Sequence, residues 1–72
     1  MVGDNCYKVV RDDGKELGTF DRSDEAQRVA QDDAATRNYS LRWTTWQGGR
    51  AGIPSTSGRG VHRYTITDVP CQ

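Results

Sequence analysis

Two segments rich in aromatic and β-branched residues constrain the fold of this 72-residue chain most strongly. Residues 39–47 read YSLRWTTWQ and residues 61–67 read VHRYTIT. In both segments apolar and polar side chains alternate with the period of two that is typical of a half-buried strand. The sequence therefore predicts two partner strands in one antiparallel sheet. Their buried face would carry Leu41, Trp43, Tyr64 and Ile66.

The segment between these two strands, residues 48–60, has neither a helical nor a strand period. It contains five glycines together with several serines and threonines, so its chain entropy is high and it has little apolar surface to bury. Ile53 and Pro54 are its stiff, apolar point. We expect a flexible loop over about residues 48–60 that projects Arg50 and Arg59 beyond the sheet.

The N-terminal part predicts a β-hairpin, with strands over residues 6–11 and 15–20 and a three-residue turn at residues 12–14. Gly14 would supply the left-handed residue of that turn. The favoured register sets Val9 opposite Leu17, which gathers the apolar side chains on one face. A two-residue turn, which would set Val10 opposite Leu17, is the alternative.

A helix is predicted from an N-cap at Ser23 to about Thr36, followed by Asn38 in a left-handed conformation. Its apolar face carries small side chains, namely Ala26, Val29, Ala30 and Ala34. The element order is then ββαββ, and we expect an α+β fold in which one helix covers one face of a four-stranded antiparallel sheet. All 72 residues would form a single domain.

The expected core is thin, because 33% of the residues are hydrophobic and the mean hydropathy is −0.87. A dimer, a disulfide or a partner would add stability to so small a domain. No apolar run suits a signal peptide or a membrane span, which indicates a cytoplasmic protein. In that compartment Cys6 and Cys71 are expected to stay reduced, although bridging them would contribute up to ~4 kcal/mol. Arginine outnumbers lysine eight to two, as in a GC-rich bacterial or phage genome.

Catalysis has little support in this sequence. His62 is the one histidine, and no serine or cysteine stands at a spacing known for nucleophilic catalysis. Cys6, Cys71 and His62 lack the close pairs of a zinc site. The glycine-rich segment joins two expected strands, whereas a phosphate-binding loop joins a strand to a helix. We therefore expect a protein that is not an enzyme and has no cofactor, metal or small-molecule substrate.

The charges divide unevenly along the chain although the net charge is zero. Residues 1–37 carry six basic and nine acidic side chains, a balance of −3, and residues 38–72 carry four basic and one acidic, a balance of +3. Aromatic rings stack on unpaired bases while arginines neutralise phosphates. The candidate nucleic-acid-binding residues are Arg42, Trp46, Arg50, Arg59 and Arg63, with Arg42, Trp46 and Arg63 on the uncovered sheet face.

The leading hypothesis is a small nucleic-acid-binding accessory protein that uses an arginine–tryptophan β-ribbon and a mobile basic loop. Its zero net charge counts against it, because dedicated nucleic-acid-binding domains are usually basic. The alternative is a protein-interaction module: a homodimer, or a phage or plasmid adaptor or inhibitor that binds a host protein. An exposed Trp46 and an unprotected sheet edge would favour that alternative.

Overall fold

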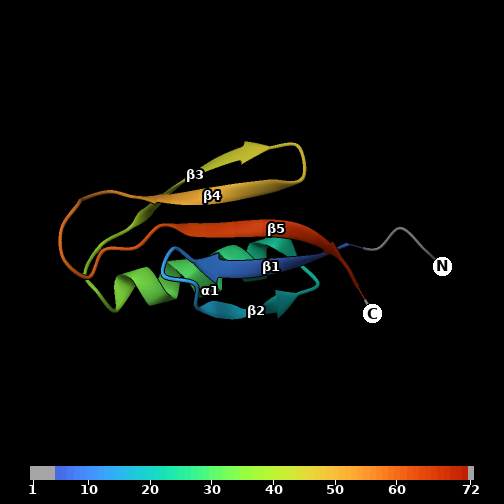
Figure 1. The fold of residues 1–72 in the computed structure, drawn as a ribbon, viewed down its shortest axis with the longest axis horizontal. Coiled ribbons are helices and arrows are strands. Elements are labelled where there is room, and N and C mark those ends of the chain that lie inside the picture. The colour runs from blue at the N-terminus through green and yellow to red at the C-terminus, as the bar shows by residue number, and fades with distance from the viewer. Residues whose placement is uncertain (1–4, 72) are drawn as a thin grey trace.

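The fold is a five-stranded antiparallel sheet with one helix on one face (Figure 1). The computed structural model describes residues 5–71. The strands follow one another across the sheet in the order β2-β1-β5-β4-β3. In chain order the elements are β1 (Asn5–Arg11), β2 (Glu16–Phe20), α1 (Ser23–Ala35), β3 (Leu41–Trp46), β4 (Gly49–Pro54) and β5 (Tyr64–Pro70).

The prediction of a four-stranded ββαββ sheet was wrong, because a fifth strand forms where a mobile loop was expected. Gln47 and Gly48 make a two-residue turn, and the chain returns at once as β4, which pairs with β3 on one side and with β5 on the other. Gly48 has a φ of 93°, which glycine adopts without strain. The two strands predicted to be partners are therefore separated by β4, and the remaining loop spans residues 55–63.

Strand β4 has weak β-propensity, and the indole rings of β3 compensate for its missing side chains. Trp46 pairs with Gly49 and Trp43 pairs with Gly52 in the β3–β4 register. A Cβ atom on Gly49 would lie 3.0 Å from the Trp46 ring and 2.9 Å from the Ile66 carbonyl oxygen. Large aromatic side chains thus cover glycines on the neighbouring strand, an arrangement that stabilises sheets containing glycine. This segment forms a strand because it pairs with strands on both sides, and not because its residues have a high β-propensity.

The N-terminal hairpin has the predicted turn but not the predicted register. Gly14 has a φ of 95°, and the Arg11 amide donates to the Lys15 carbonyl across the three-residue turn at 2.8 Å. Beyond a bulge between Val9 and Val10, Val9 pairs with Gly18 instead of Leu17. The bulge adds one residue to β2. The register favoured from the sequence holds on the turn side of the bulge, and the alternative register holds on its other side.

The prediction that Ser23 is the N-cap was wrong, because Ser23 is already the first residue of helix α1. Arg22 occupies the N-cap position and makes no side-chain capping hydrogen bond. Asp24 and Glu25 lie in the first turn, where the helix dipole favours negative charge. Asn38 has a φ of 67°, which confirms the left-handed residue predicted after the helix. Within residues 5–71 no helix could cross a membrane, because α1 is too short and too polar.

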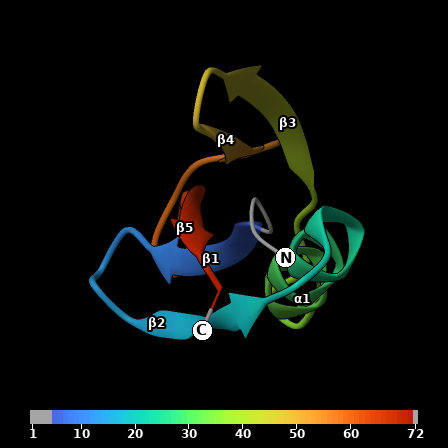
Figure 2. The same ribbon diagram turned by 90° about the vertical axis from the view of Figure 1, so that its right-hand side faces the viewer.

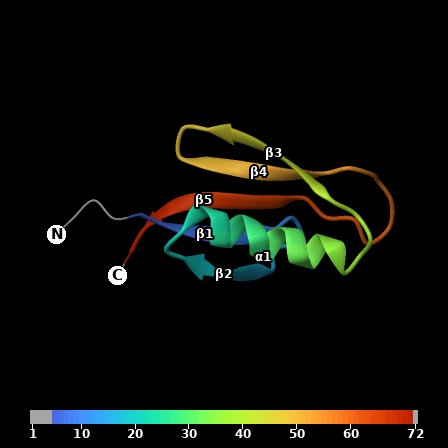
Figure 3. The ribbon, with the colours of Figure 1, turned by 180° about the vertical axis from the view of Figure 1, so that it is seen from behind.

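The core lies between α1 and the strands β1, β2 and β5 (Figure 2). Its fully buried members are Val9, Ala26, Ala30, Ala34, Tyr64 and Ile66. The small alanine side chains let the helix approach the sheet closely. Strands β3 and β4 lie to one side of the helix (Figure 3), and Trp43 is only half-buried, although Leu41 is buried.

A disulfide joins Cys6 to Cys71, with the two Cα atoms 5.1 Å apart, in place of the thiols expected from the sequence. The pairing of β1 with β5 explains this bond. Cys6 lies opposite Val69, so the start of β1 and the segment after β5 are neighbours. Closing a loop of 65 residues adds stability that the thin core would otherwise lack.

Candidate functional site

The strand register divides the side chains of the sheet between two faces. Residues paired across neighbouring strands point to the same side, and successive residues point to opposite sides. Val9, Ile66, Arg50 and Thr45 form one row across the sheet, on the face that α1 covers, which we call the core face. The next row is Val10, Thr65, Ala51 and Thr44, on the opposite face, which we call the open face.

Arg42 and Trp46 lie on the open face of β3, four residues apart, which corresponds to about 13 Å along a strand. Both are exposed, and 51% of the Trp46 surface is accessible to solvent. Trp46 packs over Gly49 and heads a row across the sheet that continues through Thr67 to Lys8. An indole ring at one end and an ammonium group at the other thus share one row of the open face.

Arg63 is exposed and immediately precedes β5, at the margin of the open face. Its backbone is fixed by Asp12, because the Arg63 amide donates to Asp12 Oδ2 at 3.1 Å and the Asp12 amide donates to the Arg63 carbonyl at 2.8 Å. Arg63 lines a depression of about 250 Å³ together with Pro54. Arg42 lines a second depression, about 500 Å³, that also borders Pro54. The two arginines therefore flank the end of β4.

Arg50 does not join this group, because β4 places it on the core face. It is half-buried, and its guanidinium carbon lies 5.9 Å from the centroid of the Tyr7 ring. Its Nε is buried and has no hydrogen-bond partner among residues 5–71. Because the segment around it is a strand, Arg50 cannot project from a mobile arm as the sequence suggested. Contact with Tyr7, 43 positions away, has no local signal in the sequence.

Arg59 is exposed in the loop of residues 55–63, between Gly58 with a φ of 142° and Gly60 with a φ of 84°. This loop connects β4 to β5 at the same end of the sheet as Arg42 and Arg63. The structure thus places three of the five candidate residues, Arg42, Arg59 and Arg63, near one end of the open face. Trp46 lies toward the other end of β3.

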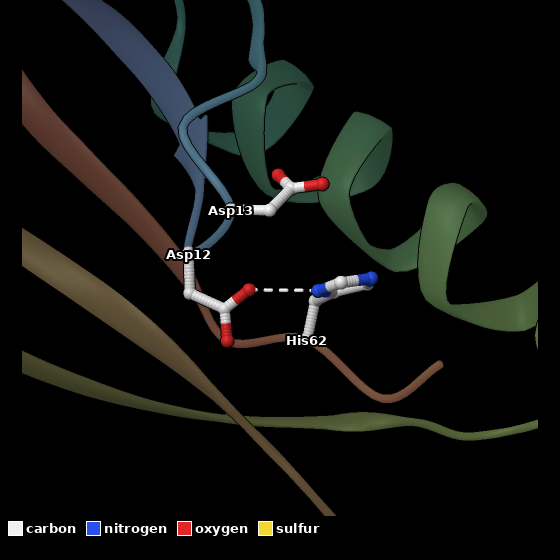
Figure 4. Close-up of side chains that lie close together, drawn as sticks. All are labelled: Asp12, Asp13 and His62. Carbon is white, nitrogen blue, oxygen red and sulfur yellow. Dashed lines mark hydrogen bonds and ion pairs between the residues drawn. The ribbon is translucent and has the colours of Figure 1, made fainter. Parts of the chain in front are cut away.

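A second cluster, which the sequence analysis missed, joins the β1–β2 turn to the end of the loop (Figure 4). His62 Nδ1 lies 2.7 Å from Asp12 Oδ1, and Asp13 lies beside them. One ligand atom from each of these three side chains falls within 4.8 Å of the others, a spacing that suits a metal ion. The chain positions of Asp12 and His62 differ by 50, so no spacing motif marks the pair.

Every carboxylate oxygen of this cluster already has a protein partner. Asp12 accepts hydrogen bonds from the Arg63 amide and contacts the His62 ring. Asp13 accepts from Arg11 Nε at 3.0 Å and from a second Arg11 nitrogen at 2.7 Å. A bidentate arginine is a strong competitor for a carboxylate. The cluster therefore fastens the turn to residues 62–63, and a metal ion would have to displace these contacts.

Beneath this cluster, a buried polar network connects the sheet to the helix. The Tyr64 hydroxyl donates to Asp33 of α1, and the Tyr39 hydroxyl lies 3.3 Å from the Tyr64 hydroxyl. The His62 amide donates to the Tyr39 hydroxyl at 2.9 Å. Burial, followed by the hydrogen bond to Asp33, raises the pKa of Tyr64 far above its usual range. The hydroxyl of Tyr64 therefore stays protonated and can donate, as a satisfied buried network requires.

Acidic side chains are scarce on the open face. The open face and its margin carry Lys8, Arg42 and Arg63, with Glu16 paired to Lys8 at 3.7 Å. Most acidic residues lie elsewhere, on α1 at Asp24, Glu25, Asp32 and Asp33, in the β1–β2 turn at Asp12 and Asp13, and on the core face at Asp68. A zero net charge thus conceals an open face with an excess of basic groups.

No protein-family model, curated protein or solved structure matches this chain.

Protonation of the carboxylates in these networks at low pH should lower the free energy of unfolding. Partial burial alone would raise the pKa of Asp12 and Asp33, but hydrogen bonds from Arg63 and Tyr64 respectively outweigh it and hold both below the ordinary 3.8. The folded state then binds fewer protons than the unfolded state near pH 4. We expect the free energy of unfolding to be level above about pH 5 and to fall as the pH drops below about 4.

Urea denaturation between pH 7 and pH 2 measures this dependence. Asp33→Asn removes one of the carboxylates while keeping the side-chain size, so the acid-induced loss should be smaller in that variant than in the unsubstituted protein. Stability that stays constant down to pH 2 would show that these contacts do not hold in solution.

Proposed function

We propose that this protein binds single-stranded nucleic acid on its open face. The observation that carries the proposal is the exposed Trp46 on a sheet face from which nearly all acidic groups are absent. An exposed aromatic ring on an uncovered sheet face offers a stacking platform for an unpaired base. Basic side chains on the same face neutralise the phosphates that follow.

The shape of the open face suits a strand of unpaired nucleotides. Between Trp46 and the basic groups, the face is built from small and hydroxyl-bearing side chains, namely Thr44, Gly49, Ala51, Thr65 and Thr67. No helix covers this face within residues 5–71 (Figure 2). Arg42 and Arg63 supply fixed positive charge at one end, and Arg59 adds a third cation from the adjoining loop. Arg50 has no part in the proposed interface, because it points to the core face.

Binding of a fluorescently labelled 12-nucleotide single strand, followed by anisotropy, tests the proposal. Trp46→Ala should weaken binding about tenfold or more, because one base–aromatic stack is worth ~1–3 kcal/mol. Arg42→Ala with Arg63→Ala should weaken binding and lower the slope of log affinity against log salt by about 0.7 for each lost phosphate contact. Duplexes of the same sequence should bind more weakly than single strands.

Arg28→Ala is the matched control, since Arg28 is exposed on α1 and lies away from the open face. It should leave both affinity and salt slope unchanged. Cys6 and Cys71 form a disulfide that a reductant would open, so oxidised and reduced protein are both titrated. The proposal fails if neither form binds DNA or RNA single strands at low salt, or if Arg28→Ala weakens binding as much as the open-face variants do.

A further inference from the structure

Strand β3 forms an edge of the sheet, and its register determines which backbone groups are free. The two-residue turn makes Trp46 and Gly49 a hydrogen-bonded pair, so Arg42, Thr44 and Trp46 direct their N–H and C=O groups toward β4. Two observations agree: the Ser55 amide donates to the Ser40 carbonyl at 2.9 Å, and Pro54, which has no N–H, lies opposite Leu41. Leu41, Trp43 and Thr45 therefore direct their backbone groups outward.

The outward groups of Leu41 are already satisfied by a side chain of the helix. Gln31 Nε2 donates to the Leu41 carbonyl at 3.5 Å, and the Leu41 amide donates to Gln31 Oε1 at 3.4 Å. Gln31 thus occupies the place that a neighbouring strand would take and marks where strand pairing must stop. Among the described residues, Trp43 and Thr45 keep four backbone groups without a partner.

Apart from Gln31 at Leu41, this edge has few of the devices that usually prevent strand pairing. β3 contains no proline, lysine or bulge, and it is rich in the aromatic and β-branched residues that favour sheets. The other edge of the sheet, β2, is interrupted by the bulge next to Leu17 and lies against α1. The exposed Trp46 stands at the unprotected edge. β3 is thus the edge that is ready to accept a strand.

We propose that the strand it accepts is β3 of a second copy of this chain, in antiparallel orientation and centred on Thr44. When a two-fold axis relates two antiparallel strands, the residue numbers of each opposed pair add up to the same value. With the axis at Thr44 this sum is 88. Trp43 then lies opposite Thr45 of the second copy, and Thr45 lies opposite its Trp43. This symmetric register pairs both free residues of each copy with those of the other, giving four hydrogen bonds. Centring on Trp43 would instead require the backbone groups of Leu41 that Gln31 occupies.

The side chains on the open face are complementary in this register. Arg42 lies opposite Trp46 of the second copy, and the two-fold axis repeats the pair. Directly opposed residues have Cβ atoms about 4.5–5.5 Å apart, which lets a guanidinium group stack on an indole ring. The two Thr44 side chains meet at the axis, so no like charges face each other. Both open faces join into one surface of a ten-stranded sheet, with both helices on the other side.

The self-complementarity favours a second copy over an unrelated peptide. Any extended peptide could satisfy the four backbone groups, but β3 itself also brings a tryptophan opposite Arg42 and an arginine opposite Trp46. A dimer would also supply the buried area that the thin core of this domain lacks. The dimer would use Arg42 and Trp46, which the proposed function assigns to nucleic-acid binding, but it does not depend on that function and is tested on protein freed of nucleic acid.

Sedimentation equilibrium of the oxidised full chain, from low micromolar to millimolar concentration, provides the test. We expect a concentration-dependent dimer. Thr44→Lys should raise the dissociation constant at least tenfold, because like charges directly opposite each other destabilise strand pairs. Thr67→Lys makes the same exposed threonine-to-lysine change on the interior strand β5 and should leave the dissociation constant unchanged.

A mixture of two variants makes the test independent of any loss of folding. Thr44→Glu alone should also be monomeric, and mixing it in equal amounts with Thr44→Lys should restore a dimer through opposite charges at the axis. Circular dichroism of each variant verifies folding, and Arg42→Glu, which opposes a carboxylate to an indole face, is a second variant that should weaken the dimer. A monomer at every concentration, a dimer unaffected by Thr44→Lys, or a mixture that stays monomeric would overturn the proposal.

Discussion

Reduction of the Cys6–Cys71 disulfide is expected to lower the free energy of unfolding by about 4 kcal/mol, the chain-entropy value for a loop of 65 residues. Small domains often have a total stability of the same size, so the reduced protein should be largely unfolded at 37 °C. The bond also holds β1 against the end of β5, at the centre of the sheet. Urea denaturation with and without a reductant measures the difference.

The double variant Cys6→Ser with Cys71→Ser serves as the control for this prediction. It should have the stability of the reduced protein, and adding a reductant should change it no further. If reduction changes the stability of the unsubstituted protein by less than about 1 kcal/mol, the pairing of β1 with β5 is sufficient without the bond, and the entropic account of the bond is wrong.

Tyr64→Ala is expected to destabilise the protein by about 3–5 kcal/mol, as large-to-small changes of aromatic core residues do. Tyr64 is fully buried between α1 and the sheet, and its hydroxyl donates to Asp33. Removing the ring leaves a cavity and also leaves Tyr39 and Asp33 without this partner. Thermal unfolding followed by circular dichroism measures the loss.

Tyr64→Phe separates packing from hydrogen bonding at this position. It keeps the ring and removes only the hydroxyl, so a smaller loss of about 1–3 kcal/mol is expected, the cost of an unsatisfied buried polar group. Asp33 keeps its contact with Arg11 at 3.3 Å in this variant. A loss equal to that of Tyr64→Ala would mean that the polar network, and not the packing of the ring, holds this end of the domain together.

Periodicity and turn chemistry in the sequence correctly predicted the elements that carry strong local signals. Asp12, Asp13 and Gly14 marked the first turn, because a left-handed residue is required there and glycine adopts that conformation without strain. The spacing of Ala26, Ala30 and Ala34 marked the buried face of α1. Alternation in residues 41–46 and 64–67 marked β3 and the first part of β5, and it placed Leu41 and Ile66 in the core.

The same signals placed Arg42 and Trp46 on the face opposite the core, because successive side chains of a strand alternate. Whether those residues bind nucleic acid remains a prediction. Arg50 was placed wrongly because its position depends on β4. Once the segment around it is a strand, the register with Ile66 puts Arg50 on the core face beside Tyr7.

Only the tertiary structure decided strand β4, the strand order and the disulfide. Residues 49–54 contain two glycines, an alanine and a proline, and Ile53 is their one β-branched residue, so local preference gives no reason for a strand. They form one because β3 and β5 offer hydrogen-bonding edges on both sides and the indole rings of Trp43 and Trp46 cover the glycines. The Cys6–Cys71 bond and the Asp12–His62 contact likewise join residues 65 and 50 positions apart. Such contacts depend on which strands become neighbours, and a pattern read along one segment carries no information about that choice.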